Sequence, residues 1–157
     1  MLAPRRLPLL LLLLAAAACG GPPPPPPTLL NAAVTVAADA NAGPEGTGAP
    51  VSLRIYQLVS PAGFEGAQFF PLFNGDAAVL KDDLVKRDDL LLAPGQSKAL
   101  TLSPPDRAKA IGVFAAYRDY ESVAWRAVAA IPANQTSTLT VMAGKAGLSI
   151  KIAPAKP

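Results

Sequence analysis

Few side chains in this 157-residue chain could do catalytic chemistry. The sequence contains no histidine, and Cys19 is its single cysteine. Without histidine the chain can form neither a Ser-His-Asp triad nor a Cys-His pair, and it has no histidine general base. Zinc sites built on histidine and cysteine are excluded for the same reason. Only carboxylate or Ser/Lys chemistry remains, so we expect neither an enzyme nor a bound metal or cofactor.

Two acidic pairs, Asp82-Asp83 and Asp88-Asp89, are the remaining candidates for a metal or glycosidase site. Adjacent residues on a strand point to opposite faces, so the carboxylates of one pair cannot converge on a ligand. We therefore interpret both pairs as solvated surface. The glycine-rich run 43–48 lacks the Gly-Lys-Ser/Thr ending of a phosphate-binding loop and leads into an expected strand, which indicates a mobile loop.

The first 18 residues have the parts of an export signal. Arg5 and Arg6 form a short basic segment, residues 7–14 are mostly apolar, and residues 15–18 are alanines. The apolar run covers about 12 residues, whereas a membrane-spanning helix needs roughly 18 or more. Residues 1–18 are thus predicted to be a signal peptide that is removed, with an uncleaved anchor as the alternative.

Cys19 lies where signal cleavage would expose it. The preceding Leu-Ala-Ala-Ala-Ala resembles a bacterial lipobox, although Ala16 occupies the position where leucine is usual. A lone cysteine in an exported protein would otherwise be an unpaired reactive thiol. We predict that Cys19 carries covalent lipid, palmitate included, whose several acyl chains attach the protein firmly to a membrane. Gly20, in place of the aspartate common in inner-membrane lipoproteins, indicates the periplasmic face of the outer membrane.

Residues 22–27 are six consecutive prolines. Such a run favours a polyproline II rod of about 3.1 Å per residue, or roughly 19 Å in all. We interpret residues 19–28 as a lipidated, stiff tether. A protein module that reads this proline segment is the alternative, and none is expected in the periplasm.

The charge of the chain argues against nucleic acid as a partner. Of 14 basic residues, Arg5 and Arg6 belong to the signal, which leaves 12 basic against 11 acidic side chains. The remaining lysines and arginines are scattered, and they form no cluster interleaved with aromatic residues.

The chain after the prolines is predicted to form one mainly β domain at residues 29–153, followed by a tail at 154–157. Apolar Leu148, Ile150 and Ile152 alternate with polar neighbours, as in a half-buried strand. Short turns between such runs favour antiparallel pairing. The pattern therefore indicates a two-sheet antiparallel β-sandwich. The expected strands are residues 29–37, 51–56, 88–92, 98–102, 110–118, 123–131, 137–143 and 148–152.

Residues 64–84 break this strand pattern, and a later strand carries the tryptophan. Apolar residues within 64–84 recur at helical spacing, which predicts one or two short inserted helices, broken near Pro71 and Asn74-Gly75. Trp125 is expected in the core, with Arg126 pointing the other way along the same strand.

Several motifs taken together resemble the TssJ lipoproteins of type VI secretion. They are Val-Ser-Leu-Arg-Ile-Tyr-Gln-Leu at 51–58, Phe64 and Phe69, Ala-Pro-Gly at 93–95, Ile-Gly-Val-Phe-Ala-Ala-Tyr-Arg-Asp at 111–119, and Trp125-Arg126. The resemblance implies a transthyretin-like sandwich tethered to the outer membrane. It also implies binding to the periplasmic C-terminal region of TssM, and through TssM to TssL, with no small-molecule substrate.

In TssJ proteins the loop between the first two strands protrudes and contacts TssM, and by strand order this loop is residues 39–50. Its glycines and prolines independently disfavour regular structure, and recognition often resides on loops of a rigid scaffold. Glu45 is the charged candidate at its tip. Because the loop lacks aromatic and arginine anchors, an inert connector is the alternative. The predicted partner-binding residues are Asp39, Ala40, Asn41, Ala42, Gly43, Pro44, Glu45, Gly46, Thr47, Gly48, Ala49 and Pro50.

A competing hypothesis is a periplasmic ligand-binding or inhibitory lipoprotein, because a β-sandwich alone does not specify a function. That role requires a concave pocket with exposed aromatic residues and converging polar groups. A convex body with a projecting loop favours assembly instead.

Overall fold

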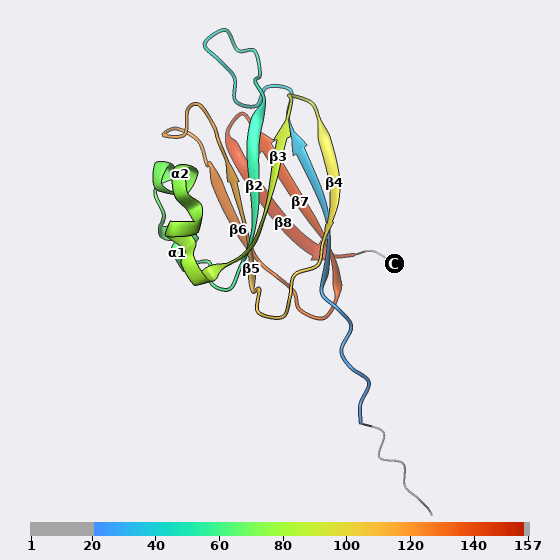
Figure 1. Ribbon diagram of the computed structural model, residues 1–157. Helices are drawn as coiled ribbons and strands as arrows, with labels where there is room; N and C mark the ends of the chain where they lie inside the picture. The colour runs from blue at the N-terminus through green and yellow to red at the C-terminus, as the bar shows by residue number, and fades with distance from the viewer. Residues whose placement is uncertain (1–20, 156–157) are drawn as a thin grey trace, which may run out of the picture.

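Eight strands form two four-stranded sheets that pack face to face, and two helices lie on the outer side of one sheet (Figure 1). The computed structural model describes residues 21–155, so the predicted signal peptide and Cys19 lie outside it. The strands are β1 (Leu29–Val36), β2 (Val51–Leu58), β3 (Leu84–Leu92), β4 (Ser97–Leu102), β5 (Ala110–Ala115), β6 (Arg126–Ala130), β7 (Thr136–Gly144) and β8 (Gly147–Pro154). The helices are α1 (Ala62–Gly66), α2 (Phe69–Leu80) and the 3₁₀ turn η1 (Lys81–Asp83).

One sheet has the strand order β4-β1-β7-β8 and the other β3-β2-β5-β6. The predicted mainly β, two-sheet sandwich with short helices is confirmed. One pair differs from the antiparallel expectation, because β1 and β7 run parallel, with Leu29 opposite Thr136 and Val36 opposite Ala143. These strands are neighbours in space but not in sequence, so the turn residues on which the expectation rested do not bear on their direction.

The main core lies between the two sheets. Along β7, residues alternate between exposed and buried, and Leu139 and Val141 are fully buried. Leu30 and Val34 of β1 and Ile55 of β2 meet them in the same cluster. Each fully buried aliphatic side chain contributes about 1.5–3 kcal/mol relative to exposure, which makes this layer the main source of stability.

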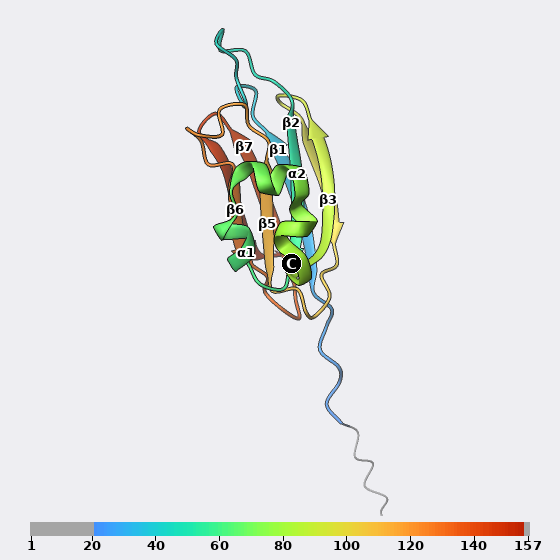
Figure 2. The same ribbon diagram turned by 60° about the vertical axis from the view of Figure 1, so that its left-hand side comes forward.

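The helices lie over the outer face of the sheet that contains β2 and β5 (Figure 2), and a second core forms between them and this sheet. Phe64 of α1 and Leu72 of α2 are fully buried there against Phe114 of β5. Gly112 permits this packing, because a Cβ at that position would lie 3.1 Å from the Phe64 ring. β5 is consequently buried on both faces.

The helix expectation is partly confirmed. Gly75 has φ −157° and ψ 53°, which kinks α2 at the predicted place. The break expected at Pro71 is wrong, because Pro71 is the third residue of α2. In the first turn of a helix the missing proline N–H has no intrahelical acceptor to lose.

Some strand boundaries also differ from the prediction. β3 begins at Leu84 rather than Asp88, because its charged first half shows no apolar alternation. β5 ends at Ala115, since the chain turns away at residues 116–125. The Asp82-Asp83 pair lies in η1 and not on a strand.

A buried carboxylate fastens α2 to the sheet. Asp76 is 5% exposed and accepts hydrogen bonds from Tyr56 Oη at 2.8 Å and from Arg87 Nη1 at 2.9 Å. Arg54 Nη1 lies 3.5 Å from the same Asp76 oxygen. Burial raises the pKa of Asp76, but the hydrogen bonds from Arg87 and Tyr56 outweigh it, so the pKa is lowered overall. Asp76 is therefore ionised and paired at neutral pH.

Six aromatic rings gather where α2 meets the β5–β6 connection. The Phe69 ring stacks on Tyr120, with centroids 4.3 Å apart, and meets Trp125 edge-on at 5.3 Å. Trp125 is half-buried and packs against both cores, in line with the expected core position. The expected direction of Arg126 is wrong, because its guanidinium lies 4.6 Å from the Trp125 ring centre. β6 starts at Arg126, so strand alternation does not extend to Trp125.

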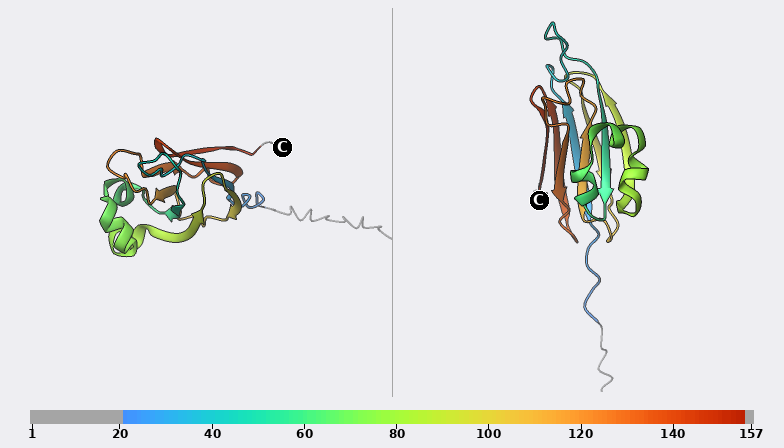
Figure 3. Two further views of the ribbon diagram at one scale, coloured as in Figure 1. Left: turned by 90° about the horizontal axis from the view of Figure 1, so that it is seen from above. Right: turned by 90° about the vertical axis from the view of Figure 1, so that its left-hand side faces the viewer.

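The tether and the β1–β2 connection lie at opposite ends of the sandwich. Residues 21–28 extend from one end, and residues 37–50 project beyond the other end (Figures 1 and 3). β1 joins the two directly. Within residues 21–155 no helix has the length and apolar character needed to span a membrane.

Candidate functional site

The stem of the predicted loop at residues 39–50 is held by hydrogen bonds. Ala40 is fully buried, and its carbonyl accepts a hydrogen bond from the Ala49 amide at 3.0 Å. Asn41 donates from Nδ2 to the Pro50 carbonyl at 3.0 Å and accepts the Arg118 amide at Oδ1 at 2.7 Å. Its φ of 52° is left-handed, a conformation that asparagine adopts more readily than most residues. Asn41 therefore ties both arms of the loop to the β5–β6 connection.

The tip of the loop has a defined turn. The Gly46 amide donates to the Gly43 carbonyl at 2.9 Å, and the Gly43 amide donates to the Thr47 carbonyl at 3.1 Å. Gly46 has φ +76°, where a side chain would be strained. Glu45, the predicted tip residue, is exposed within this turn.

The two arms of the loop approach each other closely at Gly48. A Cβ at this position would lie 2.2 Å from the Ala38 carbonyl oxygen, so only glycine fits without movement of the backbone. The loop is therefore narrow at its stem and open only at its tip.

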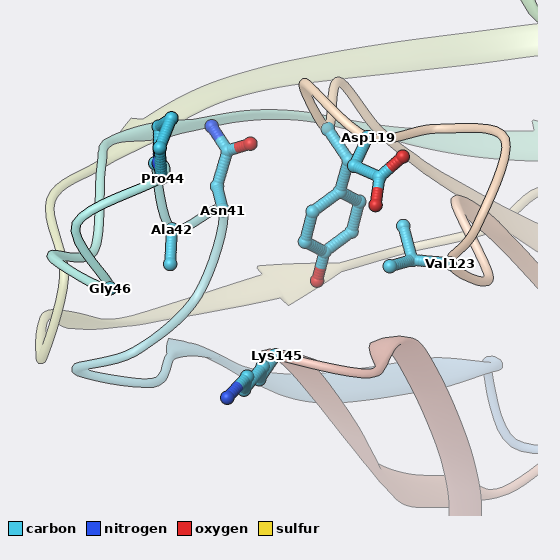
Figure 4. A pocket seen from close by; sticks show the side chains of 9 residues that line it. Asn41, Ala42, Pro44, Gly46, Asp119, Val123 and Lys145 are labelled. Atoms are coloured by element: carbon cyan, nitrogen blue, oxygen red, sulfur yellow. The ribbon is translucent and has the colours of Figure 1, made fainter.

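A pocket of about 320 Å³ lies at the base of the loop (Figure 4). Asn41 and Pro44 lie on one side, Asp119 and Val123 of the β5–β6 connection lie opposite, and Lys145 of the β7–β8 turn closes a third side. The pocket thus brings together three connections from the distal end of the sandwich, with one carboxylate and one ammonium at its rim.

Tyr117 is the aromatic residue of this pocket, and its hydroxyl is already engaged. Tyr117 Oη donates to the Gly144 carbonyl at 3.0 Å. Burial raises the pKa of Tyr117 to about 12, so the hydroxyl remains protonated at physiological pH. Tyr117 therefore positions the β7–β8 turn.

A second pocket beside the loop, of about 390 Å³, includes Glu45 and Arg118. A Cβ at Gly43 would lie 2.7 Å from Arg118 Nη1, so this glycine allows the guanidinium to lie against the loop. Arg118 was not among the predicted site residues. Its amide donates a hydrogen bond to Asn41, which is 77 positions away in the sequence. No local sequence pattern predicts a contact between residues so far apart. Arginine here supplies the kind of anchor that the loop sequence lacks.

The structure brings the predicted residues 41–48 together into one projecting hairpin-like loop, and Ala40 is buried in the stem instead of being available for contact. Among residues 21–155 no group of three His, Cys, Asp or Glu side chains lies close enough to hold a metal ion.

Comparison with known proteins points to one family. Residues 28–146 match the family described as "Type VI secretion lipoprotein, VasD, EvfM, TssJ, VC_A0113". A search of curated proteins gives no match.

Solved structures agree with the family match. The T6SS lipoprotein TssJ1 from Pseudomonas aeruginosa is 32% identical, with a TM-score of 0.79 over 83% of this chain and 100% of that chain. Lip of Serratia marcescens, a membrane bound component of the Type VI Secretion System, is 28% identical, with a TM-score of 0.73 over 83% of this chain and 98% of Lip. A chain in the structure described as "T6SS protein TssM C-terminal domain (869-1107) from EAEC" is 25% identical, with a TM-score of 0.64 over 79% and 98% of the two chains. The protein therefore belongs to the TssJ family of type VI secretion lipoproteins.

Proposed function

We propose that this protein anchors the type VI secretion membrane complex to the outer membrane by binding the periplasmic C-terminal region of TssM. The loop at residues 39–50 is the docking element, and TssL joins the assembly through TssM. The protein performs no catalysis in this role. The observation that carries the proposal is the placement of the loop at the end of the sandwich opposite the tether.

The geometry of the loop supports this role. A narrow stem, fixed by Asn41 and Gly48, holds the tip away from the body. Glu45 and Arg118 lie at one side of the loop, so charges of both signs border the docking surface. A fixed loop loses less conformational entropy on binding than a mobile one, which favours affinity.

The comparisons also support TssM as the partner. A chain similar to this one occurs in a structure whose description names the TssM C-terminal domain. The structural match covers 98% of that chain, so it concerns the whole sandwich and not a single motif.

Membrane attachment completes the proposed role. Cys19 bears the lipid, and the rod at residues 22–27 carries the domain away from the outer membrane into the periplasm. Confinement of two partners to one compartment raises their effective concentration, so an interface of modest size is sufficient if the tether reaches.

Binding between the mature chain, residues 19–157 with Cys19→Ser, and the periplasmic C-terminal region of the cognate TssM tests the proposal. The main variant replaces residues 42–48 by Asn-Gly and so keeps the stem bonds of Asn41 and Ala49. Calorimetry is expected to show at least a tenfold loss of affinity. A second pair of variants compares Glu45→Ala with Asp106→Ala. Asp106 is an exposed carboxylate at the opposite end of the sandwich, and Asp106→Ala is expected to leave affinity unchanged.

Each outcome has a distinct meaning. If the trimmed chain is folded and binds as tightly as the parent, the interface lies on another surface. If the folded parent does not bind TssM at all, the anchoring role is wrong, and the ligand-binding lipoprotein becomes the better hypothesis.

A further inference from the structure

A hollow of about 680 Å³ lies on the helical flank, where α2 begins beside the β5–β6 connection. Its walls are aromatic and include Phe69, Phe70, Tyr120 and Trp125. Phe70 is 52% exposed, a large apolar side chain left in contact with solvent. Exposed aromatic groups that line a concavity commonly mark a binding surface.

The polar groups of this hollow include two that only donate hydrogen bonds, Trp125 and Arg126, and one carboxylate, Glu121, which accepts a hydrogen bond from Tyr120 Oη at 3.3 Å. The Trp125 indole N–H and the Arg126 guanidinium can donate but cannot accept, and the Gln68 amide adds a further donor. Arg126 is held in place because it lies over the Trp125 ring and donates from Nη1 to the carbonyls of Phe64 and Ala67. The hollow therefore suits a ligand with apolar rings and unpaired carbonyl oxygens.

A polyproline segment is a ligand of this kind. Proline has no backbone N–H, and the polyproline II helix makes no internal hydrogen bonds, so every carbonyl remains free to accept. Its rings pack in aromatic-lined grooves, and the rod is already ordered before binding. Residues 22–27 of this chain are six such prolines, and all of them are exposed.

The tether of the same copy cannot reach the hollow. Thr28 is buried at the base of the sandwich, where its Oγ1 accepts the Asn134 amide at 2.9 Å. From there residues 21–27 extend away from the domain (Figure 1). The hollow includes Tyr120 of the β5–β6 connection, at the end of the sandwich away from Thr28. The eight residues of β1 separate the two ends by about 26 Å, at roughly 3.3 Å per residue. The rod is about 19 Å long and stiff.

We propose that the aromatic hollow binds the proline tether, residues 22–27, of a neighbouring copy of this chain. Lipid anchors confine both copies to one membrane, which raises the effective concentration of tether and hollow, so a weak contact is enough to hold copies together. Because the hollow lies near the distal end of the sandwich, this contact requires the accepting domain to tilt toward the membrane, so that its flank meets the rod of its neighbour. This inference rests on the proposed lipid attachment at Cys19 and does not depend on binding to TssM.

Trp125 is the only tryptophan in the sequence, so intrinsic fluorescence reports directly on the hollow. We would titrate a capped hexaproline peptide into the mature chain carrying Cys19→Ser. A saturable shift in emission is expected, and a capped (Gly-Ser)₃ peptide is expected to give none. Phe70→Ala is expected to weaken hexaproline binding at least tenfold. Leu91→Ala removes a side chain that is 72% exposed on β3, outside the hollow, and is expected to leave binding unchanged.

A fluorescence response that does not saturate, or that is the same in Phe70→Ala, overturns the proposal. Circular dichroism of each variant checks that it is folded. Phe70→Ala is expected to fold, because the Phe70 side chain is largely exposed. The peptide experiment thus separates recognition of the proline segment from damage to the domain.

The identity of the occupant is tested in the lipidated protein in its membrane. A benzoylphenylalanine at position 70 preserves an aromatic ring and cross-links to whatever lies against it. The expected product has the mass of two copies, and mass spectrometry locates the link in residues 22–27. A product formed only within one chain, only with TssM or only with lipid contradicts the proposal.

Discussion

At the scale of single residues, two polar side chains connect parts of the chain that are far apart in sequence. Asp76 joins α2 to β2 and β3, and Asn41 joins the two arms of the loop to the β5–β6 connection. Asp76 is buried, and its hydrogen bonds make a buried polar group tolerable, whereas Asn41 is only partly buried and uses both its donor and its acceptor. Their replacement has different consequences, because Asp76 fastens a helix and Asn41 positions a loop.

Asp76→Asn is expected to destabilise the folded chain by about 2–4 kcal/mol at pH 7, because Arg87 and Arg54 lose a buried counter-charge. The pKa of Asp76 is lower in the folded chain than its ordinary value of 3.8. Its stabilisation is therefore complete above about pH 4 and is lost as pH falls through the folded pKa. The variant should show a weaker loss of stability on acidification than the parent.

Urea denaturation at pH 7 and at pH 3 measures both effects. Asp82→Asn is the matched control, because Asp82 is exposed in η1. An equal loss in the two variants at pH 7 would show that Asp76 contributes no more than a surface carboxylate.

A graded series at Asn41 tests how the loop is positioned. Asn41→Asp keeps the acceptor for the Arg118 amide and loses the donor to the Pro50 carbonyl, whereas Asn41→Ala loses both bonds. Each hydrogen bond makes a net contribution to stability of about 0.5–1.5 kcal/mol, so the loss of stability should be larger in Asn41→Ala than in Asn41→Asp. Hydrogen exchange of the Arg118 amide is expected to accelerate in Asn41→Ala and to stay near the parent rate in Asn41→Asp. Equal rates in all three proteins would mean that Asn41 does not hold this amide.

At the scale of elements, alternation of apolar residues predicts where the strands lie, because a half-buried strand has a period of two. It does not predict the charged start of β3, where Lys86 and Arg87 form ion pairs instead of packing in a core. It also cannot indicate that Phe70 and Phe73 of α2 stay partly exposed, since helical spacing does not tell which face meets the sheet. Contacts such as Arg54 with Asp76 cross 22 positions, and no local pattern predicts them.

The stem of the loop offers a prediction about an element. Gly48→Ala places a methyl group against the Ala38 carbonyl oxygen, so the two arms must separate. Loss of the Ala49 amide bond to the Ala40 carbonyl should follow, with at least a tenfold faster hydrogen exchange of the Ala49 amide. Gly66→Ala is the control, because nothing lies within 4 Å of a Cβ there. Similar exchange of the Ala49 amide in Gly48→Ala and in the parent would mean that the stem has room to adjust.

At the scale of the whole molecule, the two ends of the sandwich carry different structural features. The base carries the tether, and the distal end gathers the loop, the β5–β6 connection and the β7–β8 turn. The order of strands predicts which connection follows β1. It does not predict that connections from distant parts of the sequence meet at one pocket, because that depends on sheet pairing across the whole chain. The predicted loop could thus be located from the sequence, whereas Arg118, Asp119 and Lys145 beside it could not.

Replacement of residues 22–27 by a Gly-Ser sequence of equal length tests the tether as a rigid spacer. The folded domain does not pack on most of this segment, so the midpoint of thermal unfolding should change by no more than about 1 °C. A Gly-Ser chain of six residues has a mean end-to-end distance of about 13 Å, compared with roughly 19 Å for the rod. Secretion by the assembled system is expected to fall, as measured by release of one of its secreted proteins. Unchanged secretion would show that the reach of the rod is not needed.

β1 has a consequence for mechanical load. It follows the tether directly, leads directly into the projecting loop, and lies between β4 and β7 in the middle of its sheet. A pull between membrane and partner would therefore run lengthwise along one strand. Its hydrogen bonds to both neighbours would be loaded together in shear, instead of being opened one at a time as at a strand that peels from an edge. Resistance to forced unfolding depends on the rate of unfolding, and loading in shear raises that barrier along the axis from the tether to the loop.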